Sequence, residues 1–170
     1  MKLSTQGKGK LVERASGAVV ETEWRLQKNQ LPNTQAKGWD FDWSRPQKEG
    51  FPVYELFVKS NKDVQGRIAF RPEGGVALAQ LIESKAENRG KHGKYINVGS
   101  HLFAIAALIS FQSGYDGWIA FEAKTDLIDH YRSIGAQSTF GPKEKQMHFE
   151  TPAAKRLIDE HLEGGIKYDR

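Results

Sequence analysis

Residues 94–100 (KYINVGS) combine basic, glycine and small residues in a pattern suited to holding a phosphate. They lie between a predicted strand and a predicted helix, and the first N–H groups of a helix have no partner within that helix. These groups also lie at the positive end of the helix dipole, so a phosphate or pyrophosphate is their natural ligand. Lys94, Lys91 and Arg89 add positive charge, and Gly99 permits close approach. The same residues would also suit an ordinary helix start that binds no ligand, so this alternative stays open.

Several other chemistries are excluded because the sequence lacks the residues that they require. The pattern G-x-x-x-x-G-K-[ST] does not occur, and no G-x-G-x-x-G opens a helix, so neither a nucleoside-triphosphate hydrolase nor a Rossmann dinucleotide site is predicted. The chain has no Cys, which excludes disulfides, thiolate zinc sites and cysteine nucleophiles. The histidines have no second His or carboxylate at ligand spacing, so we expect no metal site.

The elements that would position residues 94–100 can be read from the apolar pattern. Residues 53–59 and 64–70 predict a hairpin, and residues 76–83 a third strand that ends in a basic loop. A buried helix is expected over 98–113, a strand over 118–123, and a helix after Thr125 that ends at Gly135. Residues 146–150 predict a last strand, and Thr151-Pro152 begins a final helix. Antiparallel strands followed by a strand-helix alternation indicate a mixed α/β (α+β) domain.

The first fifty residues are less regular. Residues 1–10 contain Gly7, Gly9 and three lysines with little apolar content, which favours a flexible tail, and residues 11–170 are expected to form a single domain. Residues 17–26 suggest a strand, although a helix is not excluded. Residues 27–50 are expected to form a long loop or a loop around a short strand.

The composition limits the class of protein. The chain has 170 residues, 38% of them hydrophobic and 27% charged, which fits one globular domain. No apolar run is long enough to cross a bilayer and the start lacks the apolar middle of a signal peptide, so we expect a cytoplasmic protein with no membrane partner. The net charge of +4 is small for a dedicated binder of duplex DNA, which makes nucleic acid an unlikely partner.

Residues 76–136 resemble the acyl-CoA-binding core of the GNAT superfamily of N-acetyltransferases in three ordered features. The family's Arg/Gln-x-x-Gly-x-Gly/Ala appears as Lys94-x-x-Asn97-x-Gly99, with lysine and asparagine at the first two defining positions. Residues 117–124 (GWIAFEAK) are similar to the family's fifth strand. Residues 127–136 (LIDHYRSIGA) look like the helix that carries the family's tyrosine, which falls on Tyr131. Within the superfamily the chain most resembles stand-alone bacterial members.

The resemblance implies a GNAT-like fold, with a mostly antiparallel central sheet, one splayed parallel pair and flanking helices. It also implies transfer of an acetyl group from acetyl-CoA to an amine of a small molecule or peptide. The implied general acid is Tyr131, and the implied general base is Glu83, with Glu87 and His130 as alternatives. The backbone N–H of Leu81 or Ile82 would face the thioester carbonyl. The implied cofactor-binding residues are Lys94, Asn97, Val98, Gly99, Ser100, Ile82 and Thr125, with Lys124 beside them.

Other interpretations remain open at this point. The fold could serve as a degenerate binding module, or as the partner of a toxin system, without turnover. The pI of 9.2 and the aromatic residues Trp39, Phe41 and Trp43 would also suit a nucleic-acid-associated protein. Those aromatic residues could instead form a wall over the acceptor pocket or a hydrophobic lid on the sheet. The sequence also leaves open whether the protein forms a homodimer.

Overall fold

The protein, described here from a computed structural model over residues 2–142 and 144–165, is built on one sheet of nine strands. The strand order is β6-β1-β2-β3-β4-β5-β7-β9-β8, and every neighbouring pair is antiparallel except β5 and β7. The strands are β1 (Gln6–Glu13), β2 (Val19–Leu26), β3 (Val53–Val58), β4 (Asn61–Glu73), β5 (Val76–Ser84), β6 (Tyr95–Ile96), β7 (Ile119–Glu122), β8 (Gln137–Ser138) and β9 (Gln146–Phe149). The mixed α/β class with one parallel pair is as predicted.

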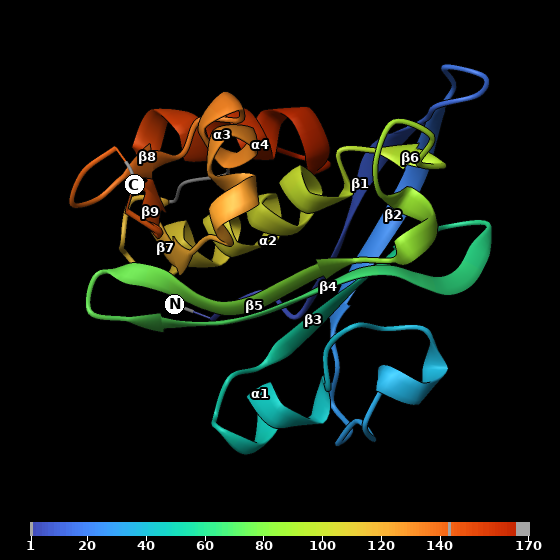
Figure 1. Cartoon of the computed structure of the whole chain (residues 1–170), viewed down its shortest axis with the longest axis horizontal. Helices are drawn as coiled ribbons and strands as arrows, with labels where there is room; N and C mark the ends of the chain where they lie inside the picture. Colours follow the sequence, from blue (N-terminus) through green and yellow to red (C-terminus); the bar gives the residue numbers. More distant parts are fainter. Residues whose placement is uncertain (1, 143, 166–170) are drawn as a thin grey trace.

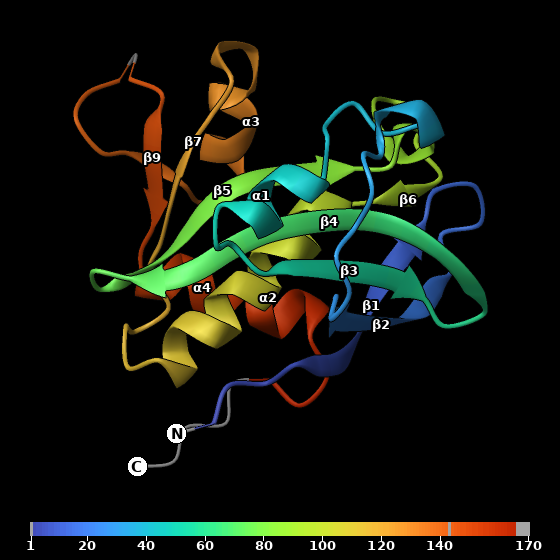
Figure 2. The same cartoon turned by 90° about the horizontal axis from the view of Figure 1, so that it is seen from below.

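Helices lie on both faces of this sheet, as Figure 1 shows. They are α1 (Ser44–Lys48), α2 (Val98–Gln112), α3 (Ile128–Ser133) and α4 (Thr151–His161), with short 3₁₀ turns η1 (Gln35–Lys37), η2 (Ala86–Asn88) and η3 (Thr125–Leu127). The helices α2, α3 and α4 lie on one side of β4 and β5, and α1 lies on the other (Figures 1 and 2). Among the described residues, no helix has the length and apolar character needed to cross a membrane.

The main core lies between the sheet and α2, which is buried around most of its circumference. Leu102, Phe103, Ile105 and Ile109 are fully buried there, because an apolar helix between a sheet and α4 has no face left for water. A second, smaller core around Trp43, Phe51 and Val53 lies on the opposite face, under residues 27–52. This segment contains two short helices and no strand, so of the two predicted alternatives the short strand is absent.

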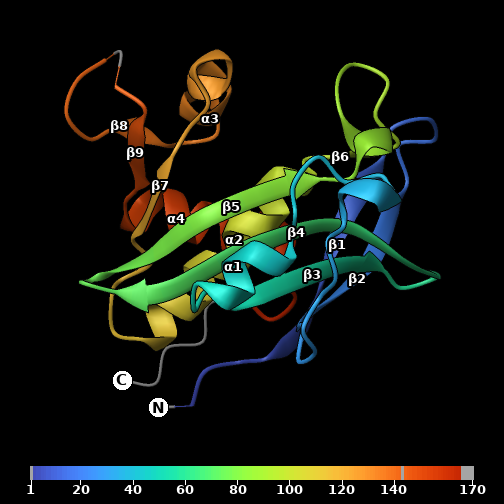
Figure 3. The same cartoon turned by 60° about the horizontal axis from the view of Figure 1, so that its bottom comes forward.

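The parallel pair opens along its length. Ala77 and Leu78 of β5 pair with Ile119 and Ala120 of β7, and the ladder ends there. Beyond this point β5 and β7 diverge, as Figure 3 shows. The register between β4 and β5 also shifts there and leaves Gln80 as an extra residue, and such a bulge bends its strand. The predicted splayed pair is therefore present.

The expectation of a flexible tail is wrong for residues 6–10, because they form most of β1 and pair with β2 along its length. Their glycines are needed for close packing. A Cβ on Gly7 would lie 2.6 Å from the ring of Trp24, and a Cβ on Gly9 would collide with the His161 carbonyl at the end of α4. Met1 of the predicted tail and residues 166–170 of the predicted domain lie outside the described residues.

Candidate active site

A pocket of about 750 Å³ opens where β5 and β7 diverge. This volume is in the range of pockets that hold cofactors and drug-sized ligands. Its walls come from β5, the end of β7, the loop around η2, the start of α2, α3 and part of residues 39–43. Predicted site residues that line it are Ile82, Glu83, Asn97, Val98, Gly99, Ser100 and Tyr131.

The start of α2 offers main-chain donors to this pocket. Asn97, the residue before the helix, has left-handed backbone angles (φ 67°, ψ 32°), which Asn tolerates better than most residues. The first internal bond of the helix runs from the N–H of His101 to the Asn97 carbonyl at 3.0 Å. Within the described part of the chain, the N–H groups of Val98, Gly99 and Ser100 have no hydrogen-bond acceptor. Three donors at the positive end of a 15-residue helix therefore remain available for an anion.

The space in front of these donors is open. A Cβ built on Gly99 meets no atom within 4 Å, so nothing in the fold itself requires glycine there. Arg14 and Lys91 also line the pocket. The guanidinium of Arg14 donates to the Gly93 carbonyl at 2.8 Å and has no carboxylate partner among the described residues. The chemistry of this donor set fits a phosphate-bearing group.

A second hollow of about 410 Å³ lies on the other side of the same helix start. Asn97 and Ser100 border both hollows, and Arg132 and Arg156 supply positive charge to the second one. The first turn of α2 thus stands between two concave surfaces with basic residues on each. An extended anion could contact both.

Tyr131 presents its phenol to the main pocket from α3. Its ring packs edge-on against Phe103 and Phe121, with centroids 5.8 Å and 5.1 Å away. Burial, with a smaller contribution from the charge of Asp126, raises the pKa of Tyr131 above its usual 10.0. Its hydroxyl has no hydrogen-bond partner in the described ranges, so a protonated and unengaged donor faces the pocket.

Glu83 is placed on β5 as predicted, but its carboxylate is already engaged. One oxygen accepts from the Asp40 N–H and from Arg89 Nη2, both at 2.7 Å. The other accepts from Trp43 Nε1 at 2.8 Å and from the Phe41 N–H at 3.3 Å. With four donors and 5% exposure, Glu83 holds the loop of residues 39–43, here called the covering loop, onto the sheet. This arrangement argues against its predicted role as a general base.

Glu83 also ends a row of charges that crosses the sheet under the covering loop. Glu55, Arg67 and Glu83 lie opposite one another on β3, β4 and β5, and all three are buried. Arg67 forms an ion pair with Glu55 at 2.9 Å and stacks under the ring of Trp39 at 4.5 Å. Buried charges are tolerated when they are paired with opposite charges. This row of charges can therefore be buried because negative and positive side chains alternate along it.

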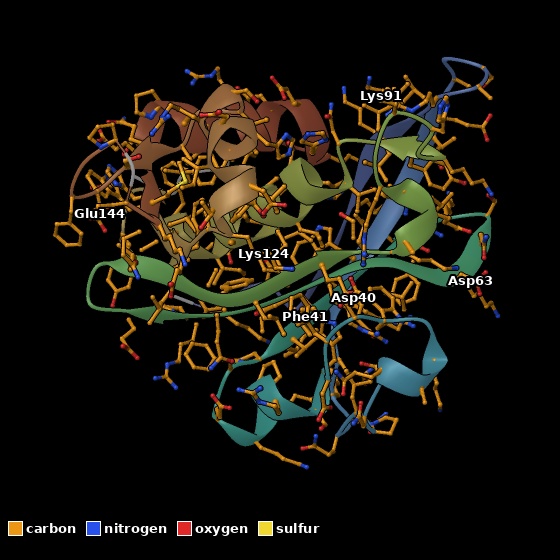
Figure 4. The ribbon with its side chains drawn as sticks, viewed as in Figure 1. Asp40, Phe41, Asp63, Lys91, Lys124 and Glu144 are labelled. Atoms are coloured by element: carbon orange, nitrogen blue, oxygen red, sulfur yellow. The ribbon has the colours of Figure 1, made fainter. Side chains whose placement is uncertain are left out.

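The aromatic residues of the covering loop divide between the two expected roles. Trp43 is fully buried in the second core and Trp39 covers Arg67, so these two form a lid on the sheet. Phe41 alone reaches the main pocket. There the ammonium of Lys124 lies 4.8 Å from the centre of its ring, an approach that Figure 4 shows across β5.

Two predicted cofactor contacts lie elsewhere. Lys94 is not among the pocket residues, because its backbone is fixed by bonds to Glu87 and Arg14 and its ammonium lies 5.4 Å from the Tyr95 ring. Thr125 begins η3, makes no capping bond, and lies outside the pocket, whereas the preceding Lys124 lines it. Glu87 pairs with Lys85 and also lies outside.

Other pocket residues were missed or kept only as alternatives. His130, an alternative base, lines the pocket, and so do Glu122, Asp40 and Arg14. No sequence motif marks Asp40 or Arg14, because they reach the pocket through long-range packing. Glu122 could have been found, since it follows the splayed strand directly. No group of three or more potential metal ligands occurs among the described residues.

Comparison with solved structures shows the fold. The chain is similar to a mutant of the AtaT toxin bound to the C-terminus of the antitoxin AtaR and acetyl-CoA, with a TM-score of 0.57 and 13% identity over 80% of this chain and 97% of that one. It is also similar to a protein of Lactobacillus plantarum assigned as an N-acetyltransferase, with a TM-score of 0.52 and 16% identity over 69% and 82%. No protein-family model matches, and a search of curated proteins by sequence finds no match.

A further similar structure is an AtaT–AtaR complex bound to DNA, with a TM-score of 0.50 and 18% identity over 67% of this chain and 77% of that one. At these identities the similarity concerns the arrangement of the chain. The protein has the GNAT acyl-CoA N-acyltransferase fold, as the three ordered sequence features predicted.

Proposed function

We propose that the protein transfers an acetyl group from acetyl-CoA to an amine. One observation supports this above the others: three N–H groups at the start of α2, unpaired within the described structure, face a pocket that lies where β5 and β7 diverge. That combination suits a long thioester with a diphosphate in its middle. Acetyl-CoA supplies the activated acetyl group, and the residues of the chain bind it, orient it and exchange protons.

The diphosphate would be held by the N–H groups of Val98, Gly99 and Ser100, with Asn97 setting the backbone turn. Lys91 and Arg14 on one side, and Arg132 and Arg156 on the other, add positive charge for its phosphates. Ile82 would line the thioester end, since its side chain packs on the α2 side of β5. These contacts are those expected from helix-terminus anion binding.

Tyr131 is the proposed general acid, which would protonate the departing thiolate. Its raised pKa keeps the phenol protonated at neutral pH, and its hydroxyl has no hydrogen-bond partner among residues 2–142 and 144–165. His130 is the proposed general base in place of Glu83. It neighbours Tyr131, lines the same pocket, and has a ring without a hydrogen bond to any described residue.

The acceptor would be an amine on a small molecule or a peptide. A second candidate partner comes from the comparisons, since the AtaT structures contain an antitoxin chain and, in one case, DNA. Those partners belong to that system, but they weaken the expectation that nucleic acid plays no part. Binding of labelled RNA or DNA that falls steeply with salt would favour a nucleic-acid acceptor.

A titration with acetyl-CoA tests the proposal, with Gly99→Ala and Gly99→Val as graded variants. Because the space around Gly99 is open, we expect both variants to fold like the wild type. The added methyl groups would occupy the path of the phosphate, so binding should weaken by about ten-fold or more for valine. Absence of heat and of a thermal shift with wild-type protein at millimolar acetyl-CoA would overturn the proposed function.

A further inference from the structure

Lys124 brings a primary amine of the protein itself into the candidate active site. It follows β7 directly, with an extended backbone (φ −67°, ψ 144°) that starts η3. Its side chain lines the main pocket together with Tyr131 and the first residues of α2. Figure 4 shows it extending over β5 toward Phe41 and Asp40 of the covering loop. The amine therefore lies in the space where an acetyl donor and an acceptor would meet.

The ammonium of Lys124 is only weakly held. It lies 4.8 Å from the centre of the Phe41 ring, and no carboxylate pairs with it among the described residues. An exposed contact of this kind is weak, so the side chain can leave the ring at little cost. Arg89, by contrast, is fixed in the same pocket by 2.7 Å bonds to Asp40 and Glu83. Lys124 is therefore a movable amine of this pocket, as is Lys91 at the η2 loop, and Lys124 is the one that follows β7 directly.

We propose that Lys124 Nζ is an acetyl acceptor within its own chain, so that the protein acetylates itself at this position. This inference rests on the proposed function. The neutral amine attacks the thioester carbonyl, a C–N bond forms and the C–S bond breaks. The thiolate leaves with a proton, which Tyr131 can donate, and the second proton lost by the nitrogen restores the Tyr131 phenol. The products are Nε-acetyl-lysine, free CoA and the proton that the ammonium released to water or to His130.

Acetylation would change the entrance of the pocket. The modified side chain carries no charge, so it loses the electrostatic attraction to the Phe41 ring. One positive charge of the pocket also disappears, so Glu122 remains as a carboxylate for a cationic acceptor, whereas Asp40 stays paired with Arg89. Self-acetylation would thus prepare the site for an external amine.

The test is to incubate the full chain with acetyl-CoA and follow each lysine by peptide mass mapping. Lys94 is the internal reference, because its ammonium also lies over an aromatic ring, at 5.4 Å from Tyr95, but outside the pocket. We expect Lys124 to be acetylated about ten-fold or more faster than Lys94, since its amine is held near the donor. The rate should not change when the protein is diluted, as expected for a reaction within one chain.

Two variants separate catalysed from chemical acetylation. Tyr131→Phe keeps Lys124 but removes the acid, so modification of Lys124 should slow by about 100-fold while that of Lys94 stays the same. Lys59→Arg, on the distant β3 side, is the matched lysine control and should leave modification of Lys124 unchanged.

A parallel calorimetric titration with acetyl-CoA distinguishes the two proposals. If acetyl-CoA binds but Lys124 and Lys94 are modified equally, self-acetylation is overturned and the proposed function stands. If acetyl-CoA does not bind, the proposed function itself fails.

Discussion

The polar groups on the two sides of β5 differ in whether they already have hydrogen-bond partners. On the α2 side, the N–H groups of Val98, Gly99 and Ser100 lack partners in the described structure, and a pocket lies in front of them. On the opposite side, the Glu83 carboxylate receives four hydrogen bonds and is buried under the covering loop. Unused donors indicate a binding role, whereas satisfied buried groups indicate a structural one. The N–H groups of α2 therefore form a recognition surface, whereas Glu83 borders the same pocket but holds the covering loop onto β5.

The largest expected effect is on stability, from Glu83→Ala. The substitution leaves the buried Trp43 indole and two backbone N–H groups without their acceptor, and it removes one of the two carboxylates that Arg89 contacts. We expect the free energy of unfolding to fall by about 3 kcal/mol, measured by urea denaturation. Glu73→Ala, which removes an exposed partner of Arg71, should cost about 0.5 kcal/mol or less. Equal losses in the two variants would contradict the structural role of Glu83.

The next effect separates chemistry from folding at Tyr131. Tyr131→Phe removes a hydroxyl that is unpaired among the described residues, so the free energy of unfolding should change little. Turnover of a test amine should fall by about 100-fold, equivalent to about 2.7 kcal/mol in the barrier. The measurement is thiol release from acetyl-CoA under saturation. A variant that loses stability and keeps its rate would assign Tyr131 to the core alone.

Acid should lower the free energy of unfolding through His101, a fully buried residue in the first turn of α2. Burial, and next the neighbouring His161, lower its pKa from 6.5 to about 3. The unfolded chain therefore takes up a proton on His101 at a pH where the folded chain does not. Stability should be fully present above pH 6.5 and fall as the pH drops toward 3, by about 1.5 kcal/mol between pH 6.5 and 5.

Urea denaturation at several pH values measures this loss. His101→Gln keeps a polar partner for Thr22, whose hydroxyl lies 2.8 Å from His101 Nε2. It should flatten the pH dependence over this range, after allowance for His161, whose pKa burial also lowers. An unchanged slope in this variant would place the acid sensitivity elsewhere.

The smallest effect concerns the turn before α2. Asn97→Ala places an alanine at φ 67° and should cost about 1 kcal/mol, while Asn97→Gly should cost close to nothing. Thermal unfolding of the two variants provides the comparison. If both destabilise equally, the Asn97 side chain has a role beyond allowing the left-handed turn.

Local patterns predicted the centre of the fold. The strands β3, β4 and β5 and the helix α2 follow from β-branched and apolar runs. The order of α2, β7 and α3 with Tyr131 indicated the fold itself. These features depend on neighbours in the sequence, which is why the sequence alone was sufficient for them.

Features that depend on distant contacts could not be predicted. The sequence pattern suggests a free carboxylate at the end of a strand for Glu83, because three of its four donors lie about 40 residues earlier in a loop without regular pattern. In the sequence, Gly7 and Gly9 suggest a flexible segment. A side chain is excluded at these positions because Trp24 lies beside Gly7 and His161, about 150 residues later, lies beside Gly9. Lys94 carries the motif's charge, but the loop around η2 turns it away from the pocket.

The contact between β1 and the end of α4 has a consequence for how the protein is made. The N–H of Glu163 donates to the Lys8 carbonyl, and Gly9 pairs with Leu162. Strand β1 therefore lacks this neighbour until Leu162 and Glu163 have also left the ribosome, long after β1 itself. During that interval its edge is exposed to association with other chains, so truncation near the carboxyl end should promote aggregation during synthesis.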